Sequence, residues 1–350
     1  MNARISQRRS PSRRNGSAHR CAGFTLVELM IAMLLGLIVI AGVTSVFLAG
    51  QKSYRTNNAL ANVQDSSRVA FELMARDIRE AGFTGCGTSR IADLLNNGPA
   101  NGGTTWWANW DNAVHGYASG TADPAVTTGA AAGNRVSAAT GTDSLEVLSA
   151  NVLPVRITAA DPVSAEFTLN AAAPSNLEAG DVILVCDPDH VSITQTTTVN
   201  GTLVDHAASG TPGNCTSELN YPVACGANDG NGYQYSNNAT MGKLDAVDWY
   251  IGHNDDEGTS LYRISLENDT GTPTASPQEM VRNVKGMTIT YLQSGNTDFV
   301  AADAVTNWAD VTAVHVELEL VSTFQRATVD ATKPITRKFA FTTTVRNRVQ

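Results

Sequence analysis

One long apolar run dominates the hydrophobic pattern of the chain. Residues 24–50 include a single charged side chain, Glu28. As a helix, this run would be about 40 Å long and could cross a bilayer core of about 30 Å. An ionisable side chain inside a membrane segment is costly, so we expect Glu28 to have a function or a partner.

After this run the pattern becomes amphipathic. Across residues 52–81, apolar side chains recur near a period of 3.6 residues, which is typical of a helix with one buried face. Charges of alternating sign at i,i+4 spacing indicate a solvated opposite face, formed by Arg68, Glu72, Arg76 and Glu80. Gly82 is suited to cap the helix. We predict one helix with a transmembrane half at 24–50 and an amphipathic half at 51–82.

The remaining residues, 83–350, have the pattern of a β-rich head. Short runs of Val, Ile, Thr and aromatic residues are separated by turn residues, and residues 315–320 alternate strictly between polar and apolar. We predict about ten strands, at 144–150, 155–159, 166–169, 182–186, 191–199, 247–252, 261–266, 287–293, 311–322 and 338–346. The expected fold is α+β, with a mainly antiparallel sheet packed on the long helix.

Two segments of the head lack a regular period and are rich in turn-forming residues. They cover residues 96–142 and residues 205–240. The first contains three of the five tryptophans of the chain, Trp106, Trp107 and Trp110. These rings either pack back on the head as a small core, which we favour, or form an aromatic contact for a neighbouring subunit.

The charge distribution indicates how the helix is oriented. The first 23 residues contain six arginines and no acidic residue, which predicts a cytoplasmic N-terminus and an exported head. Cleavage at Gly23 would remove this basic leader, 1–23, and keep the helix. Of the 24 basic residues of the chain, 18 would remain against 33 acidic ones, a net charge of −15. Such an acidic product argues against binding of nucleic acid through its phosphates.

The cysteines fit an exported protein with disulfides. Cys21 belongs to the leader, and four cysteines remain, an even number that predicts two disulfides in an oxidising compartment: Cys86, Cys186, Cys215 and Cys225. Three pairings are possible. We favour Cys215 with Cys225, which close a short loop, and hence Cys86 with Cys186. None of the four has the spacing of a zinc or redox motif.

No catalytic motif is found in the sequence. It contains no nucleophile elbow, zinc-protease helix, phosphate-binding loop or dinucleotide fingerprint, so we expect no enzyme activity, cofactor or metal. The acidic turns at 229–232 and 255–257 offer oxygen ligands for calcium but lack the spacing of an EF-hand loop, and we interpret them as solvated turns. A membrane-anchored enzyme or ligand-binding ectodomain is the less favoured alternative.

The residues around the leader boundary resemble a known processing site. Gly23, followed by Phe-Thr-Leu-Val-Glu, resembles the prepilin signal (class III) of type IV pilins and pseudopilins. The resemblance implies that a prepilin peptidase cuts between Gly23 and Phe24 and N-methylates Phe24, and that Glu28 is the acidic position that acts in assembly. An uncleaved signal anchor is the alternative.

Three further stretches resemble the PilW family of minor pilins. They are residues 76–86 at the end of the helix, residues 180–187, and residues 339–348 near the C-terminus. The resemblance implies a minor pilin that takes part in initiating the type IV pilus, at or near its tip. A pseudopilin of type II secretion, similar to the J component, is the alternative, although such proteins are usually smaller.

The same resemblance implies partners and a location. The partners would be other minor pilins, the major pilin, the prepilin peptidase, the inner-membrane assembly platform and a large tip adhesin. Before assembly the protein would be a single-pass protein of the inner membrane with a periplasmic head. After assembly it would lie in the extracellular pilus.

Overall fold

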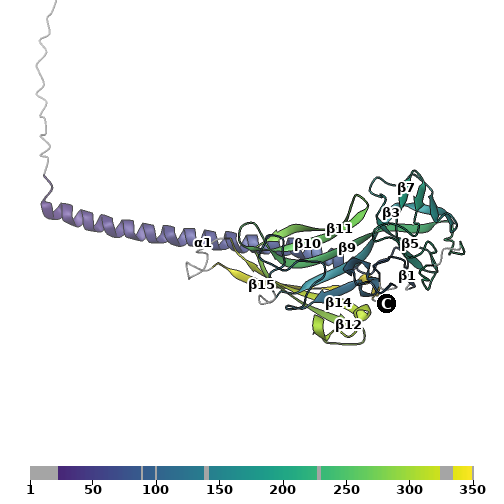
Figure 1. Ribbon diagram of the computed structural model, residues 1–350. Helices are drawn as coiled ribbons and strands as arrows, with labels where there is room; N and C mark the ends of the chain where they lie inside the picture. The colour runs from purple at the N-terminus through teal and green to yellow at the C-terminus, as the bar shows by residue number, and fades with distance from the viewer. Residues whose placement is uncertain are drawn as a thin grey trace, which may run out of the picture. The chain divides into compact units, whose positions relative to one another are not determined.

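The helix α1 (Leu26–Glu80) is the longest element of the protein, with 55 residues. Figure 1 shows it in the computed structural model, which describes residues 23–87, 90–98, 101–137, 142–226, 230–323 and 334–348. The chain divides into two compact units, Met1–Tyr54 and Arg55–Gln350, and α1 belongs to both. The predicted leader, apart from Gly23, lies outside the described residues together with Cys21.

The two halves of α1 differ in burial. Every residue from 23 to 50 is exposed, and this part of the helix is long and apolar enough to span a membrane. The second half buries residues three or four positions apart, as expected for an amphipathic helix: Ala59, Val63, Ser67, Ala70, Met74, Ala75 and Ile78. At its end, Gly82 adopts a φ of +71°, a left-handed conformation that glycine allows without strain.

The charged face of α1 is solvated, as predicted. Arg68 Nε lies 3.1 Å from Glu72 Oε1, and Arg76 Nε lies 3.6 Å from Glu80 Oε1. All four side chains are about half exposed or more. Exposed pairs of this kind add only about 0.3–0.5 kcal/mol each, so the head holds this half of the helix through its apolar face.

The larger of two sheets contains eleven strands. Its strand order is β1-β6-β5-β9-β3-β4-β8-β7, with β10 and β11 added beside β9 and with β2 paired to β3. All of its pairings are antiparallel except that of β1 with β6. The strands are β1 (Ile91–Asp93), β2 (Val114–Tyr117), β3 (Ser144–Asp161), β4 (Glu166–Leu169), β5 (Val182–Cys186), β6 (Val191–Gln195), β7 (Thr198–Asn200), β8 (Leu203–Asp205), β9 (Ala239–His253), β10 (Thr259–Asp269) and β11 (Thr272–Arg282).

The smaller sheet contains four antiparallel strands in the order β13-β12-β14-β15. Its strands are β12 (Val284–Gln293), β13 (Val300–Ala301), β14 (Val311–Val321) and β15 (Thr336–Thr344). Short 3-10 turns complete the head at η2 (Trp106–Ala108), η3 (Trp110–Asn112), η5 (Ala302–Ala304), η6 (Trp308–Asp310) and η7 (Arg346–Arg348). The predicted α+β class with a mainly antiparallel head is therefore confirmed, although the head has two sheets where we expected one.

The second half of α1 shares one hydrophobic core with both sheets. Met74 and Ile78 of the helix belong to the same buried cluster as Trp249 of β9 and Val316 and Leu318 of β14. Figure 1 shows β9 to β11 along one side of this part of the helix and β12, β14 and β15 along the other. The strict alternation predicted for residues 315–320 is observed, with the apolar positions of β14 buried.

Several strands differ from their predicted bounds. β4 and β5 begin and end as predicted, whereas two predicted strands join into β3. We did not predict β11, which pairs only with β10 at the edge of its sheet and contains Pro273 and Pro277. An edge strand tolerates proline and needs few buried side chains, so its sequence lacks the usual strand pattern.

Candidate functional site

The predicted cleavage site lies immediately before the first turn of α1. Gly23, Phe24 and Thr25 precede the helix and are exposed, with 81 % of the Phe24 side chain accessible. Thr25 begins the helix as its N-cap: its Oγ1 accepts a hydrogen bond from the Glu28 amide at 3.3 Å, and its carbonyl accepts one from the Leu29 amide at 3.1 Å. The bond between Gly23 and Phe24 is thus exposed and outside the helix.

Glu28 lies in the first turn of α1. A carboxylate there is stabilised by the unpaired amides and the positive end of the helix dipole. Glu28 is exposed, and no ion pair joins it to a basic side chain within the part of the chain that the structure describes. The pattern Thr-x-x-Glu is a known helix-start signal, so the capping role of Thr25, which we had not predicted, was available from the sequence.

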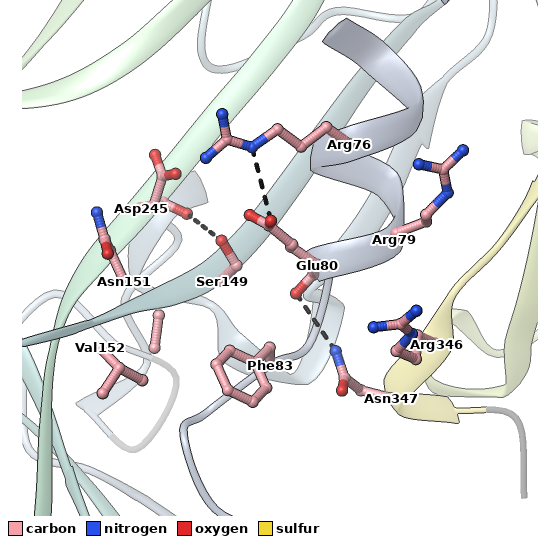
Figure 2. Close-up of a pocket in the computed structure, with 11 residues that line it drawn as sticks. Arg76, Arg79, Glu80, Phe83, Ser149, Asn151, Val152, Asp245, Arg346 and Asn347 are labelled. Atoms are coloured by element: carbon pink, nitrogen blue, oxygen red, sulfur yellow. Dashed lines mark hydrogen bonds and ion pairs between the residues drawn. The ribbon is translucent and has the colours of Figure 1, made fainter. Parts of the chain in front are cut away.

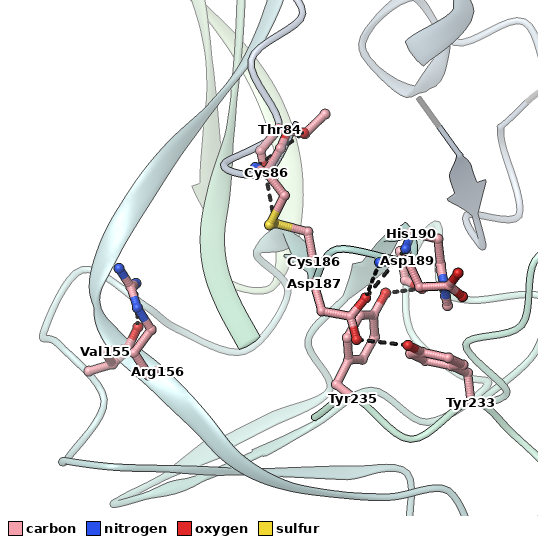
Figure 3. The surroundings of a disulfide bond; sticks show 11 residues. Thr84, Cys86, Val155, Arg156, Cys186, Asp187, Asp189, His190, Tyr233 and Tyr235 are labelled. Carbon is pink, nitrogen blue, oxygen red and sulfur yellow. Dashed lines mark hydrogen bonds and ion pairs between the residues drawn. A yellow bond between two sulfur atoms is a disulfide. The ribbon is translucent and has the colours of Figure 1, made fainter. Parts of the chain in front are cut away.

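The disulfide between Cys86 and Cys186 ties the segment after α1 to the end of β5. Its Cα atoms are 6.0 Å apart, and the two cysteines are 100 positions apart in the sequence (Figure 3). Cys186 is fully buried, and Thr84 lies next to the bridge, with its carbonyl 3.5 Å from Cys186 Sγ. The second disulfide joins Cys215 and Cys225, with Cα atoms 4.9 Å apart. These are the two pairs favoured from the sequence.

The three tryptophans of residues 96–142 are not exposed. Trp106, Trp107 and Trp110 are between 5 and 8 % accessible and pack with Leu148 and Tyr250 in a core of the head. A side chain that fills the core of its own subunit cannot also anchor a neighbour, so the candidate partner contact is corrected to a core role. We predicted a long loop for this segment, whereas the structure has two short helices and a strand in it, η2, η3 and β2.

A pocket of about 580 Å³ opens at the C-terminal end of α1 (Figure 2). Its walls include Phe83 and Val152, three arginines and two carboxylates: Arg76, Arg79, Arg346, Glu80 and Asp245. Because side chains of both signs line it, the pocket has no single charge preference. We did not single out this pocket in the sequence because its residues lie far apart along the chain.

The last residues of the head are held against the end of α1. Asn347 donates hydrogen bonds from its side-chain amide to the carbonyl of Ala81 at 3.1 Å and to that of Glu80 at 3.4 Å. These carbonyls belong to the end of a helix, where backbone acceptors lack partners within the helix. The C-terminal segment therefore caps a helix that ends more than 260 positions earlier.

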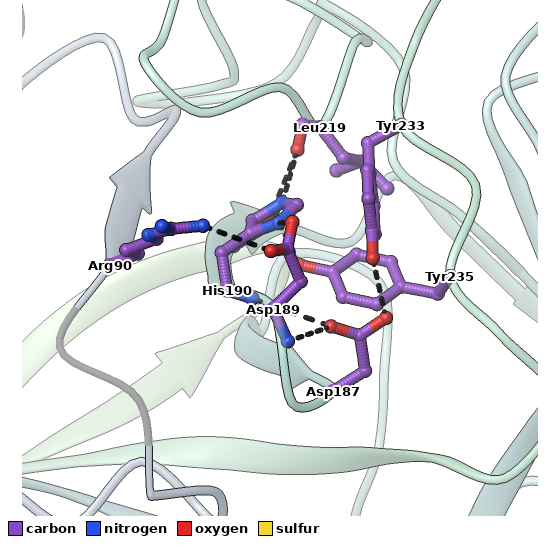
Figure 4. Close-up of polar contacts among 8 residues, drawn as sticks. Arg90, Asp187, Asp189, His190, Leu219, Tyr233 and Tyr235 are labelled. Carbon is purple, nitrogen blue, oxygen red and sulfur yellow. Dashed lines mark hydrogen bonds and ion pairs between the residues drawn. The ribbon is translucent and has the colours of Figure 1, made fainter.

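The buried side chain of His190 lies among polar side chains in the segment after β5 (Figure 4). His190 Nε2 is 2.7 Å from the carbonyl of Leu219, and its Nδ1 is 3.4 Å from Asp189 Oδ2. Tyr233 donates to Asp187 Oδ2 at 2.7 Å, and the side-chain hydrogen bond lowers the pKa of Asp187 against the opposing effect of burial. Both ring nitrogens of His190 are engaged within the protein, so this cluster stabilises the loop after β5.

The two acidic turns that the sequence offered as calcium ligands are residues 229–232 and 255–257. Residues 255–257 lie in the turn between β9 and β10, where Asp256 forms an ion pair with Arg282. Of the other turn, Asp229 lies outside the described residues. Across the described ranges, no group of three or more His, Cys, Asp or Glu side chains is placed to hold a metal ion.

Comparison with known protein families identifies the start of the chain. Residues 18–44 match the family model of the prokaryotic N-terminal methylation motif. No curated protein matches the chain. The motif, the apolar helix and the α+β head together support a type IV pilin-like protein, either a pilin or a pseudopilin, that is processed by a prepilin peptidase and assembled at a membrane.

Proposed function

We propose that this chain is a minor pilin of the type IV pilus, similar to the PilW family, that helps to initiate pilus assembly at or near the tip. The observation that carries the proposal is Glu28. Its carboxylate lies in the first turn of an exposed apolar helix and has no cationic partner among the described residues. In this proposal the role of the protein is structural, and no residue acts as a catalyst.

Glu28 acts as a registration contact between subunits. In a bilayer or in the apolar core of a filament, an isolated carboxylate is costly. After cleavage, the N-methylated Phe24 of an adjacent subunit carries a positive amine, and pairing with it compensates both charges. Because this pairing occurs at one axial offset between the two helices, it fixes their stagger.

The PilW assignment is supported by where its three matching stretches lie in the head. Residues 76–86 include the last turn of α1 and the segment after it, residues 180–187 include β5, and residues 339–348 include most of β15. The disulfide between Cys86 and Cys186 joins the first stretch to the second, and Asn347 of the third donates a hydrogen bond to the carbonyl of Ala81 in the first. The three stretches thus form one connected structural unit around the end of the helix.

The proposed partners follow from this role. They are other minor pilins, the major pilin and a large tip adhesin in the filament, and the inner-membrane assembly platform before it. The unassembled protein has its N-terminus in the cytoplasm and its head in the periplasm, and the assembled protein is extracellular.

Replacing Glu28 with Ala tests the proposal. We expect the variant to be exported and cleaved normally, because Gly23 and Phe24 are retained, but to support few or no surface pili. Processing is measured by the mass of the mature chain, and piliation by electron microscopy and by the sheared surface fraction. Glu72→Ala, which removes an exposed carboxylate from the other half of the same helix, is the control and should leave piliation intact.

Normal piliation by the Glu28→Ala strain would overturn the assembly role. Loss of protein secretion with normal pili would instead assign the chain to a type II secretion system. Failure of cleavage would place the role of Glu28 in processing.

A further inference from the structure

Three side-chain oxygens in one region of the head are buried without a hydrogen-bond partner. They are Asp93 Oδ2, Asn97 Oδ1 and Asn109 Oδ1. Asp93 is only 9 % accessible. Ten such side-chain atoms occur among the described residues, and these three belong to two segments of the head. A buried polar atom without a partner costs about 1–3 kcal/mol, so their grouping needs an explanation.

The first two oxygens belong to one tight turn after β1. Asp93 ends the strand, and its Oδ1 accepts a hydrogen bond from the Leu95 amide at 3.0 Å. The Gly98 amide closes the turn on the Leu95 carbonyl at 3.0 Å. A Cβ atom at Gly98 would come within 2.5 Å of Asp93 Oδ2, so this oxygen faces the turn that also carries Asn97.

The third oxygen comes from the segment that joins the buried tryptophans. Asn109 links η2 to η3, and Leu95 of the turn belongs to the same buried cluster as the tryptophans on both sides of Asn109. Burial raises the pKa of Asp93 to about 7, the hydrogen bond from the Leu95 amide lowers it, and the charge of Asp111 raises it, so Asp111 lies near enough to act on Asp93. The two segments therefore bring two carboxylates and two amide oxygens to one region.

We propose that Asp93, Asn97, Asn109 and Asp111 provide oxygen ligands for a divalent cation of the calcium type. Calcium takes six to eight oxygen ligands from carboxylates, amides, backbone carbonyls and water, in a flexible geometry. Two of the four proposed side-chain ligands are asparagine amides. The site therefore contains only two acidic side chains, fewer than the three His, Cys, Asp or Glu residues that would mark a metal cluster among the described residues.

The order of residues in the turn agrees with this chemistry. Asp93, Asn97 and Gly98 occupy the first, fifth and sixth positions of a calcium loop, where EF-hands have two ligands and an invariant glycine. The third position is Leu95, which cannot be a side-chain ligand and instead packs in the core. The segment with Asn109 and Asp111 supplies the oxygens that the incomplete loop lacks.

A bound cation would give the buried oxygens of Asp93, Asn97 and Asn109 the partner that they lack in the structure, and it would fix the tryptophan segment against β1.

Calcium-dependent melting of the full chain in detergent tests the site. We expect the Tm to rise by about 2–4 °C between 0.1 mM EGTA and 5 mM CaCl₂, with half of the effect below 1 mM, as for extracellular calcium modules. Asp93→Asn should lose this rise, and in EGTA it should melt no lower than the unmodified chain because a buried charge is removed. Asp248→Asn, which alters the other unpaired buried carboxylate, should keep the calcium response.

Two results would overturn the site. One is an unmodified chain whose Tm does not respond to calcium, which means that Asp93 is simply protonated in the fold. The other is a rise of equal size in Asp93→Asn. If Asp93→Asn does not fold, Asp111→Asn, which changes an exposed side chain, is measured in its place. For the proposal to stand, its calcium-induced rise in Tm must be at least several-fold smaller than that of the unmodified chain.

Discussion

Four ionisable side chains meet inside the head, around β3 and β9. Glu146 and Asp248 are directly opposed across these two strands, and Asp123 and Arg135 come from the preceding segment. Each is at most 5 % accessible. One arginine thus faces three carboxylates, and Arg135 Nη1 lies 3.9 Å from Asp123 Oδ2. The excess of acids predicts that at least one carboxylate carries a proton at neutral pH.

Folding raises the pKa of Glu146. Burial raises the pKa of Glu146 to about 8, the hydrogen bond from Tyr117 at 2.8 Å lowers it, and the charge of Asp123 raises it further. An acid whose pKa is raised by folding stabilises the fold fully below its unfolded pKa, near 4.5. That contribution is lost as the pH rises through about 8, because the unfolded chain gives up the proton more easily.

Replacing Glu146 with Gln should therefore change how stability depends on pH. Gln cannot ionise but keeps an oxygen that accepts from Tyr117. We expect the variant to match the unmodified chain near pH 4.5 and to exceed it at pH 8.5 by on the order of 3 kcal/mol in free energy of unfolding. Urea unfolding at both pH values measures this. Glu267→Gln, at an exposed position of β10, is the control; a difference that is constant with pH would contradict the prediction.

At the scale of elements, the end of α1 is joined to the head by a disulfide and by several hydrogen bonds. The disulfide of Cys86 fixes the segment after the helix to β5, and the side chain of Asn347 caps the last helical carbonyls. Gly82 turns the chain there, and its amide donates to the Leu148 carbonyl of β3 at 2.8 Å. Force or register transmitted along the helix would therefore reach both sheets through this point.

The two disulfides should contribute unequally to stability. In the chain-entropy model, a bridge that spans 100 positions stabilises by about 4–5 kcal/mol and one that spans 10 by about 2–3 kcal/mol. We expect the pair Cys86→Ser and Cys186→Ser to lower the free energy of unfolding more than the pair Cys215→Ser and Cys225→Ser. Denaturant unfolding of both double variants measures the difference. The opposite order would show that the short excursion matters more to the fold than the link at the helix end.

At the scale of the whole molecule, the two units of the chain differ in whether their apolar side chains are exposed or buried. The described part of the first unit exposes an apolar helix, whereas the second contains all the buried clusters, beginning at Ala59. Large exposed apolar surfaces are stable only against lipid or protein. The first unit therefore determines where the protein can reside, and the second determines its folded stability.

A shortened chain that begins at Arg55 should fold without a membrane. It keeps every residue of the buried clusters and loses the apolar surface, so we expect a soluble monomer whose Tm lies within a few degrees of that of the full chain in detergent. Calorimetry and analytical ultracentrifugation check both properties. Aggregation, or a large fall in Tm, would show that the apolar half of α1 contributes to the stability of the head.

The sequence by itself determined the features of the long N-terminal helix and of the segment before it. The predicted cleavage position, the acidic residue Glu28 and the helix end before Gly82 are each indicated by residues that are close to one another in the sequence, because helical periodicity and helix ends are local properties. The alternation of polar and apolar residues that predicts β14 is also a local property of the sequence. The pilin-like start of the chain and the α+β fold class could be predicted for the same reason.

Only the tertiary structure decided which distant residues meet. The burial of Trp107, the separation into two sheets and the edge strand β11 depend on strand pairing across long stretches of chain, which no local pattern specifies. The same holds for Asp93 and Asn109, which are unremarkable in the sequence. They become a candidate cation site because folding buries their oxygens in neighbouring segments without partners, a cost that exists only in the folded state.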